Sequence, residues 1–323
     1  MAPFRPAPYR SVALPNAAAA LPATRLTPDV AARAQTLFGR VRSVHRAAVY
    51  VDLGPPDGLL VLAIDDVGGT PGGILVGGTP DLRTVGIERG MALLPSAQGW
   101  SIPTAGVTID ASRAQTWSPA LPASAHVRMT KRLTRAGTTA RGLAADRAPA
   151  GGLAPLLSGR DRPGDPWLAV AAGCIRRQRD ALAAGDVASA LNPTVDLIGL
   201  GSGSTPSGDD YLVGLLAGLE ATRHPARDAI AGAIAAAAPT RTTAIGAAML
   251  GHATRGAFAE RLHDVLVALA AGRTDGLTTA IERAMAYGAT SGSDTLVGLF
   301  CALEIAGAQQ TVAGRARPGR VAA

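Results

Sequence analysis

Short apolar runs separated by glycine and proline fill the first part of the chain. Val49 and Val51 alternate with Tyr50 and Asp52, and Leu59–Ile64 is a compact run. Short runs bounded by turn-forming residues are typical of β-strands. The pattern therefore predicts a small β-rich domain over residues 36–130. Further strand candidates are Ile74–Val76, Val107–Ile109 and His126–Met129.

From residue 166 onward the apolar spacing becomes that of helices. Leu212, Leu215 and Leu219 recur three and four residues apart, which places them on one face of a helix. We therefore expect the α+β fold class, with the β-rich domain followed by an α-helical domain over residues 166–310 that holds the ligand site. The predicted helices are Trp167–Leu182, Gly208–Thr222, Arg227–Ala238, Thr242–Thr254, Phe258–Leu269, Leu277–Met285 and Ser293–Ala306.

Three segments are predicted to lie outside these domains. Prolines recur through residues 1–35, which we expect to be a flexible N-terminal segment. Residues 131–165 are rich in Arg, Gly, Pro and Ala without sustained periodicity, and are predicted to form a linker. Residues 311–323 are predicted to be a loose tail.

One stretch of the helical part occurs twice. Residues 207–220 and 291–304 agree at nine of fourteen positions, including Asp210 with Asp294 and Gly214 with Gly298. We interpret the two stretches as a duplicated Gly/Ser/Asp turn–helix unit. Small residues one helical turn apart would let the two helices cross closely and bring their N-terminal ends together.

The net charge of +7 and the isoelectric point near 10.3 raise the question of nucleic-acid binding. Lys131 is the only lysine, the arginines are scattered, and aromatic residues are only 3% of the chain. Because the basic segments carry no interleaved aromatics for base stacking, we expect no nucleic-acid partner.

The cysteines and the apolar runs place limits on the compartment. Cys174 and Cys301 are far apart and lack CxxC spacing, so neither a disulfide framework nor a zinc site is expected. Prolines interrupt any apolar segment of a signal peptide, and no apolar run reaches the length of a membrane span. The prediction is a cytoplasmic protein without membrane contact.

The turn Gly199–Asp210 is the strongest candidate site. Glycines can adopt left-handed backbone angles that let successive N–H groups converge on a ligand, and the following helix start is electropositive. Neighbouring hydroxyl groups add donors, so we predict a cradle for a small anion. The turn is not a P-loop because no lysine follows, and Pro206 stands where a dinucleotide fingerprint needs glycine.

Asp209 and Asp210 follow this turn, and three roles are open for them. They could favour the helix start electrostatically, with Ser207 as the N-cap. They could accept N–H groups of a substrate amide, or they could bind Mg²⁺ together with Asp294 if the two turns face each other. The predicted catalytic residues, or metal ligands if Mg²⁺ is present, are Asp209, Asp210 and Asp294.

A second polar helix start at Thr242 and Thr243 could supply further donors, although Thr243 alone is most simply a cap. Arg255 could pair with a carboxylate or phosphate, while His252 is expected to be structural. The predicted substrate-binding residues are Gly201, Ser202, Gly203, Ser204, Thr205, Ser207, Gly208, Thr242, Thr243, Arg255, Ser291 and Gly292.

Three segments resemble a known protein family. They read LIGLGSGSTPSGDDYLVGLLAGL, TRTTAIGAAMLGHATRGAF and GATSGSDTLVGL, and they are similar to the AllH-type subunit of oxamate carbamoyltransferase. A weaker similarity in SVHRAAVYVDL, GLLVLAID and PGGILVGG extends the resemblance to roughly residues 40–306.

The resemblance implies a carbamoyltransferase component in purine (allantoin) catabolism that works with partner subunits. Carbamoyl would be exchanged between oxalurate and phosphate, giving oxamate and carbamoyl phosphate. No Ser–His–acid or Cys–His arrangement is evident in the sequence. We therefore expect catalysis by positioning and electrostatics.

Two other functions stay open. SGDD and SGSD at helix starts loosely resemble Mg²⁺-dependent, all-helical ADP-ribosylglycohydrolases, but the late turn has one aspartate and the β-rich part has no counterpart there. The chain could also be a non-catalytic ligand-binding or assembly subunit. Its expected partners are a small anionic or amide-bearing substrate and either other carbamoyltransferase subunits or further copies of this chain.

Overall fold

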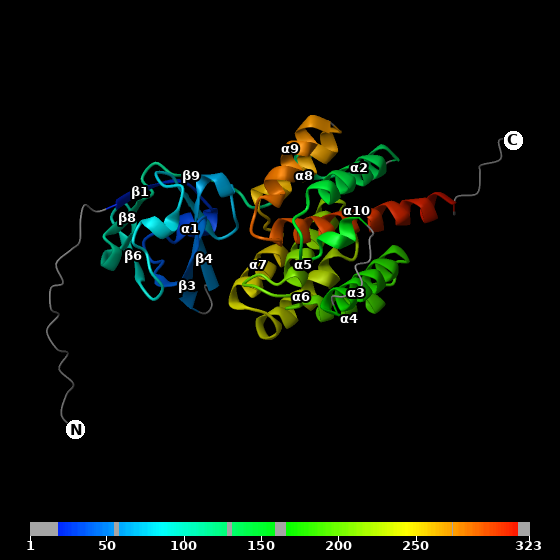
Figure 1. Ribbon diagram of the computed structural model, residues 1–323, viewed down its shortest axis with the longest axis horizontal. Coiled ribbons are helices and arrows are strands. Elements are labelled where there is room, and N and C mark those ends of the chain that lie inside the picture. The colour runs from blue at the N-terminus through cyan, green and yellow to red at the C-terminus, as the bar shows by residue number, and fades with distance from the viewer. Residues whose placement is uncertain (1–18, 55–57, 128–130, 159–165, 273, 316–323) are drawn as a thin grey trace, which may run out of the picture. The chain divides into compact units, whose positions relative to one another are not determined.

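The computed structural model describes residues 19–54, 58–127, 131–158, 166–272 and 274–315 (Figure 1). The chain divides into two compact units. The first comprises Met1–Asp66 and Ile74–Thr116, and the second comprises Val67–Gly73 and Trp117–Ala323. Each unit has its own core of buried apolar side chains.

The first unit is a sheet that closes on itself. The strands follow the order β5-β4-β3-β2-β6-β7-β8-β1-β9, and β1 also pairs with β5, so β1 to β8 form a closed eight-stranded barrel. The strands are β1 (Ala19–Leu26), β2 (Gly39–Val44), β3 (Ala48–Gly54), β4 (Gly58–Ile64), β5 (Gly73–Val76), β6 (Ala92–Ser96), β7 (Gly99–Ile102), β8 (Val107–Asp110) and β9 (Gln115–Thr116). The short helices are α1 (Pro28–Ala32), η1 (Asp65–Val67), η2 (Leu82–Thr84) and η3 (Pro103–Ala105).

The predicted fold class, a small β-rich domain in an α+β protein with a duplicated turn–helix unit, is wrong. The strands form a closed barrel, and β1 completes it from within the segment predicted to be flexible. Leu21 pairs in parallel with Ile109 of β8, and Ala23 pairs antiparallel with Val76 of β5. β1 is alanine-rich and contains Pro22, so its own sequence carries little strand signal, and pairing with distant strands stabilises it.

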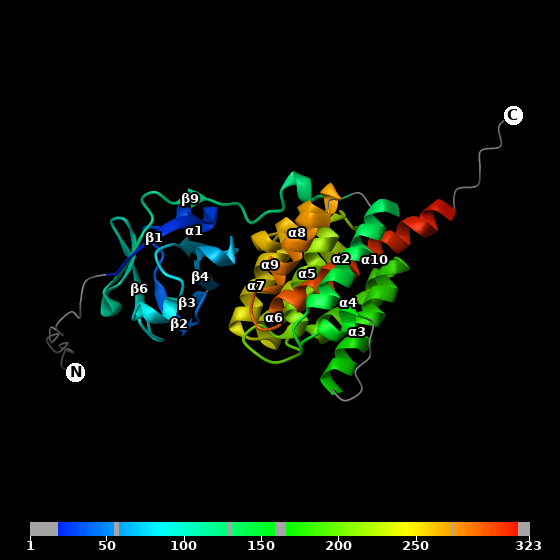
Figure 2. The ribbon, with the colours of Figure 1, turned by 45° about the horizontal axis from the view of Figure 1, so that its top comes forward.

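The second unit is helical. Its elements are η4 (Ala123–Ala125), α2 (Lys131–Arg147), η5 (Ala154–Leu157), α3 (Pro166–Ala183), α4 (Val187–Leu197), α5 (Ser207–Ala221), α6 (Arg227–Arg241), α7 (Ala244–Thr254), α8 (Glu260–Ala271), α9 (Thr274–Met285) and α10 (Ser291–Arg315). The other helices pack around α5 and α10 (Figure 2). In the described part of the chain, no helix has the length and apolar character that a membrane crossing requires.

Several predicted element boundaries differ from the structure. α2 lies in the segment predicted to be a linker. Its arginines and glycines obscure the helical periodicity in the sequence, but Ala140 and Ala144 are buried and stabilise the helix through its small apolar face. α10 extends to Arg315, into the predicted tail, while residues 1–18 and 316–323 lie outside the described residues. The strand predicted at His126–Met129 is absent at 126–127, which follow η4, and its remaining residues are not described.

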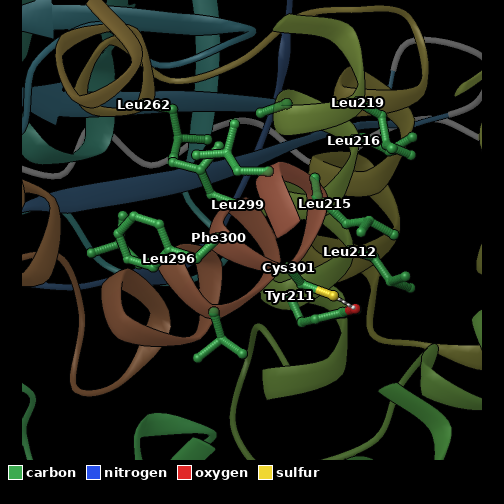
Figure 3. Close-up of a cluster of buried hydrophobic side chains, with 14 of the residues drawn as sticks. Tyr211, Leu212, Leu215, Leu216, Leu219, Leu262, Leu296, Leu299, Phe300 and Cys301 are labelled. Atoms are coloured by element: carbon green, nitrogen blue, oxygen red, sulfur yellow. Dashed lines mark hydrogen bonds between the residues drawn. The ribbon is translucent and has the colours of Figure 1, made fainter. Parts of the chain in front are cut away.

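α5 and α10 cross with their backbones in direct contact. Leu215 of α5 and Leu299 of α10 belong to the cluster of buried side chains drawn in Figure 3. A Cβ atom added at Gly214 would overlap the carbonyl oxygen of Thr295, and one at Gly218 would lie 2.5 Å from the Cβ of Ala302. The residue numbers at these contacts increase together along α5 and α10, so the two helices run in the same direction. Their N-terminal ends therefore adjoin.

The segments that precede these two helices differ. Residues 198–206 form a long glycine–serine loop before α5, whereas residues 286–290 form a short turn before α10. The helices correspond to each other, but the turns do not. This difference overturns the predicted duplication of a whole turn–helix unit.

Candidate functional site

The loop between α4 and α5 has an unusual backbone. Gly199, Gly201 and Gly203 have φ angles of +77°, +113° and +101°, which other residues rarely adopt. A Cβ at Gly199 would also overlap the carbonyl oxygen of Arg241. The loop exposes Ser202 and Ser204 to solvent, so their hydroxyl groups and the neighbouring N–H groups are accessible to a ligand.

The start of α5 is buried, unlike the loop. Pro206 is the N-cap and makes no side-chain cap bond, so the predicted capping role of Ser207 is wrong. Ser207 is the first helical residue, and Asp209 and Asp210 follow within the buried first turn. Carboxylates in the first turn interact favourably with the helix dipole, but burial opposes their charge.

Asp209 holds the loop and the next helix together. Its Oδ1 accepts a 2.8 Å hydrogen bond from the N–H of Gly199, and its Oδ2 accepts one from the hydroxyl of Thr242. A Cβ at Gly246 would overlap this carboxylate. Burial raises the pKa of Asp209, while these two hydrogen bonds lower it. Both oxygens are engaged, so Asp209 positions other groups.

Asp210 and Asp294 are brought together by the crossing of α5 and α10. Burial is the largest cause that raises the pKa of Asp210 well above its usual value, and the charges of Asp294 and Asp209 add to it. Burial also raises the pKa of Asp294 to about 6, against a hydrogen bond from Leu153. Among the described residues, the buried Oδ2 atoms of both side chains have no hydrogen-bond partner.

The two helix starts are linked directly. The hydroxyl oxygens of Thr205 and Ser291 lie 3.0 Å apart, and both side chains lower the pKa of Asp210 by hydrogen bonding. Ser207 lowers the pKa of Asp294 from the opposite helix. Two electropositive helix ends, the three hydroxyl-bearing side chains of Thr205, Ser207 and Ser291, and two carboxylates thus share one place in the fold.

Two predicted ligand-binding glycines have packing roles. A Cβ at Gly208 would overlap the carbonyl oxygen of Leu197, and one at Gly292 would overlap that of Ala284. Because their missing side chains are occupied by neighbouring backbone, neither position faces open space for a ligand.

The second polar helix start joins the site, whereas Arg255 does not. Thr243 caps α7 by accepting from the N–H of Gly246 at 2.9 Å, and its hydroxyl donates to the carbonyl of Ser204 at 2.6 Å. Arg255 is the C-cap of the same helix, roughly 18 Å away along its axis at 1.5 Å per residue. The structure therefore does not bring Arg255 together with the other predicted site residues.

A contact that the sequence did not reveal completes the surroundings of Asp294. The N–H of Leu153 donates to its Oδ1 at 2.6 Å, and a Cβ at Gly152 would overlap the same carboxylate. This segment lies within the predicted linker. The Gly151–Gly152 pair, both with positive φ, is the one sequence signal for such a close approach.

The acidic residues do not form a metal site of the predicted kind. Within the described ranges, no group of three or more His, Cys, Asp or Glu side chains is arranged to hold a metal ion. Both carboxylate oxygens of Asp209 accept hydrogen bonds, from Gly199 and Thr242, so its role differs from that of the other two carboxylates. The residues present do not fit a three-carboxylate Mg²⁺ site.

Comparison with known proteins adds one finding. Residues 197–303 match the family model of the oxamate carbamoyltransferase subunit AllH. No curated protein and no solved structure matches the chain. The match runs from the end of α4 to within α10 and includes both adjoining helix starts, but it does not include the barrel. Over residues 197–303, the predicted resemblance of this chain to the AllH family is therefore confirmed.

Proposed function

We propose that this chain is a component of a carbamoyltransferase that acts on oxalurate or oxamate and carbamoyl phosphate in purine (allantoin) catabolism. The adjoining N-terminal ends of α5 and α10 are its ligand site. The observation that carries the proposal is the Thr205–Ser291 contact, which joins two helix starts around the partly unpartnered carboxyls of Asp210 and Asp294. The family match over the same residues supports it.

The site offers hydrogen-bond donors and carboxyl groups. The donors suit the binding of an anionic group, and the carboxyl groups suit the proton transfer to the leaving nitrogen. Phosphate attacks the carbamoyl carbon of oxalurate, the bond from that carbon to the oxamate nitrogen breaks, and oxamate leaves with a proton. Exposed N–H and hydroxyl groups around Ser202 and Ser204 hold the anionic group. A protonated carboxyl at Asp210 or Asp294 can donate to the leaving nitrogen, and a carboxylate there can accept from the amide.

The roles of the three acidic residues then differ. Asp210 and Asp294 touch the reacting group, because each has a buried oxygen without a partner among the described residues. Asp209 is a positioning residue that fixes the loop against α7 through Gly199 and Thr242. Catalysis rests on orientation and preorganised charge, with no covalent intermediate.

The test is the Asp210→Asn variant, assayed for carbamoyl phosphate formation from oxalurate and phosphate with the companion subunits present. We expect loss of at least about 100-fold in kcat, the scale of general acid–base catalysis. The fold should be retained, at a cost of at most about 1 kcal/mol in unfolding free energy. Asp228→Asn, which removes an exposed aspartate in the first turn of α6, is the matched control and should keep full activity.

Full activity of Asp210→Asn would refute the role of this carboxyl. Phosphate or oxamate binding without turnover, in every combination of subunits, would instead identify a ligand-binding or assembly subunit. EDTA-sensitive hydrolysis by the chain alone would identify the hydrolase. The cytoplasmic location stays a prediction, which fractionation of cells that express the protein would check.

A further inference from the structure

A recess in the helical unit lies away from the adjoining helix starts. It is bounded by α2, η5, α3 and α10 and has a volume of about 160 Å³. On α10 it is lined by Val297, Phe300, Cys301 and Glu304, which lie roughly 9–20 Å along the helix from Ser291 at 1.5 Å per residue, and none of the predicted site residues lines it. It is therefore separate from the proposed carbamoyl site.

Apolar side chains form one part of this recess. Leu157, Ile175, Val297 and Phe300 line it, and each is more than nine-tenths buried. Such a surface favours a hydrocarbon or aromatic body over a fully hydrated ion. Burial raises the pKa of Cys301 to about 12, so its thiol stays neutral and would not repel an anion.

Arg141 is fixed in the wall of the recess. Its Nε donates to the carbonyl of Leu157 at 2.9 Å, and its Nη2 donates to that of Leu156 at 2.6 Å. Its Nη1 pairs with Glu304, the acidic residue of the lining. This ion pair neutralises Glu304. The other two arginines of the lining, Arg176 and Arg179, then have no acidic residue within the lining to balance their charge.

Arg176 and Arg179 supply that positive charge from one face of α3, three residues apart. Arg179 pairs with Asp180, but both side chains are about half exposed, so a competing anion can displace this weak pair. Arg176 makes no hydrogen bond or ion pair with any residue of the described ranges. Its guanidinium is therefore available to a ligand.

We propose that this recess binds a small carboxylate with a compact apolar body. Arg176 and Arg179 hold the carboxylate, since the planar guanidinium matches its geometry. The body packs against Ile175 and Phe300. The volume is well below that of a site for a drug-sized ligand, about 300 Å³ or more, so a single ring or a short chain fits.

The test is titration of the full chain with benzoate and with butyrate, followed by calorimetry and by NMR of the Ile175 and Val297 methyl groups. We expect benzoate to shift both methyl signals, and neutral benzamide to bind at least about tenfold more weakly. The double variant Arg176→Gln/Arg179→Gln should weaken benzoate binding at least about tenfold. Ala172→Phe, which fills the recess, should abolish it.

Arg177→Gln is the matched control. Arg177 is exposed on the same helix but is absent from the lining, so its loss should leave benzoate binding unchanged. Three results would overturn the proposal: no benzoate-dependent shift at Ile175, equal binding of benzamide, or unchanged binding by the double variant. Shifts confined to Ile198, beside the loop before α5, would also overturn it, because the anion would then occupy the other site.

Discussion

Buried carboxyl groups dominate the chemistry of this protein at the scale of single residues. Asp209 has hydrogen bonds at both oxygens, whereas Asp210 and Asp294 each keep a buried oxygen without a partner in the described part of the chain. An unpaired buried polar atom costs free energy. Natural proteins usually satisfy such atoms, so their occurrence at two adjoining helix starts supports the proposed ligand site there.

Asp294 should make stability depend on pH. Its folded pKa of about 6 lies above its ordinary value of 3.8, so the folded state holds the proton more tightly. The stability this provides is complete below pH 3.8 and is lost as the pH rises through about 6. The unfolding free energy of the wild type, relative to Asp294→Asn, should therefore fall by about 2 kcal/mol between pH 4 and pH 7.

Urea denaturation of both proteins across this pH range measures that difference. Asp228→Asn, which removes an exposed carboxylate, controls for the loss of charge itself. A difference between wild type and Asp294→Asn that stays constant with pH would show that burial does not shift this group.

The crossing of α5 and α10 determines the site at the scale of elements. Gly214 and Gly298 are each packed against backbone of the opposite helix, so the two helices approach more closely than side chains would allow. Leucines on both helices bury their flanks (Figure 3). Because the helices run in the same direction, their electropositive ends reinforce each other at one place.

Gly298→Ala should separate these helices. The added Cβ would overlap the carbonyl oxygen of Tyr211, and we expect a loss of about 2 kcal/mol or more in unfolding free energy, because overpacking a close contact forces backbone shifts. Gly232→Ala is the matched control, since it is helical, exposed and has open space around it. That variant should be neutral or more stable by up to about 1 kcal/mol. Equal stability of the two variants would contradict the close crossing.

At the scale of the whole molecule, the chain passes between its two units more than once. The segment Val67–Gly73 groups with the helical unit, although the chain on either side of it groups with the barrel unit. Glu260, at the start of α8, secures this segment through two hydrogen bonds. Its Oε2 accepts from the N–H of Gly69 at 2.7 Å, and its own N–H donates to the carbonyl of Gly69 at 2.8 Å.

Glu260→Gln should loosen the segment 67–73. Replacing the carboxylate weakens a charge-assisted hydrogen bond, so the stability of the local structure should fall by about 1 kcal/mol. Hydrogen exchange at the amide of Gly69 should then accelerate several-fold. Glu282→Gln, which removes one partner of an exposed ion pair with Arg147, is the control and should leave that amide unchanged. Unchanged exchange in Glu260→Gln would show that the backbone contact alone holds the segment.

Local sequence signals predicted individual helices and the unusual loop. The leucine spacing after Asp210 predicts α5, the position of Thr243 predicts the cap of α7, and glycines predict the left-handed angles of the loop before α5. α4 was missed because Pro193 interrupts its helical pattern, although Asp186 caps it. Each correct prediction depends on residues within a few positions of one another.

Contacts between residues far apart in the sequence decided the rest. Barrel closure depends on β1 pairing with both β8 and β5, and the surroundings of Asp294 depend on Leu153 from a segment without helical periodicity. Arg255 could not be excluded from the site until the length of α7 placed it at the far end. By itself the sequence determined several of the helices and where the backbone needs glycine, because short-range sterics and hydrogen bonds fix those features. Only the tertiary structure decided which carboxyls are buried together, because burial and pairing are properties of the packed chain.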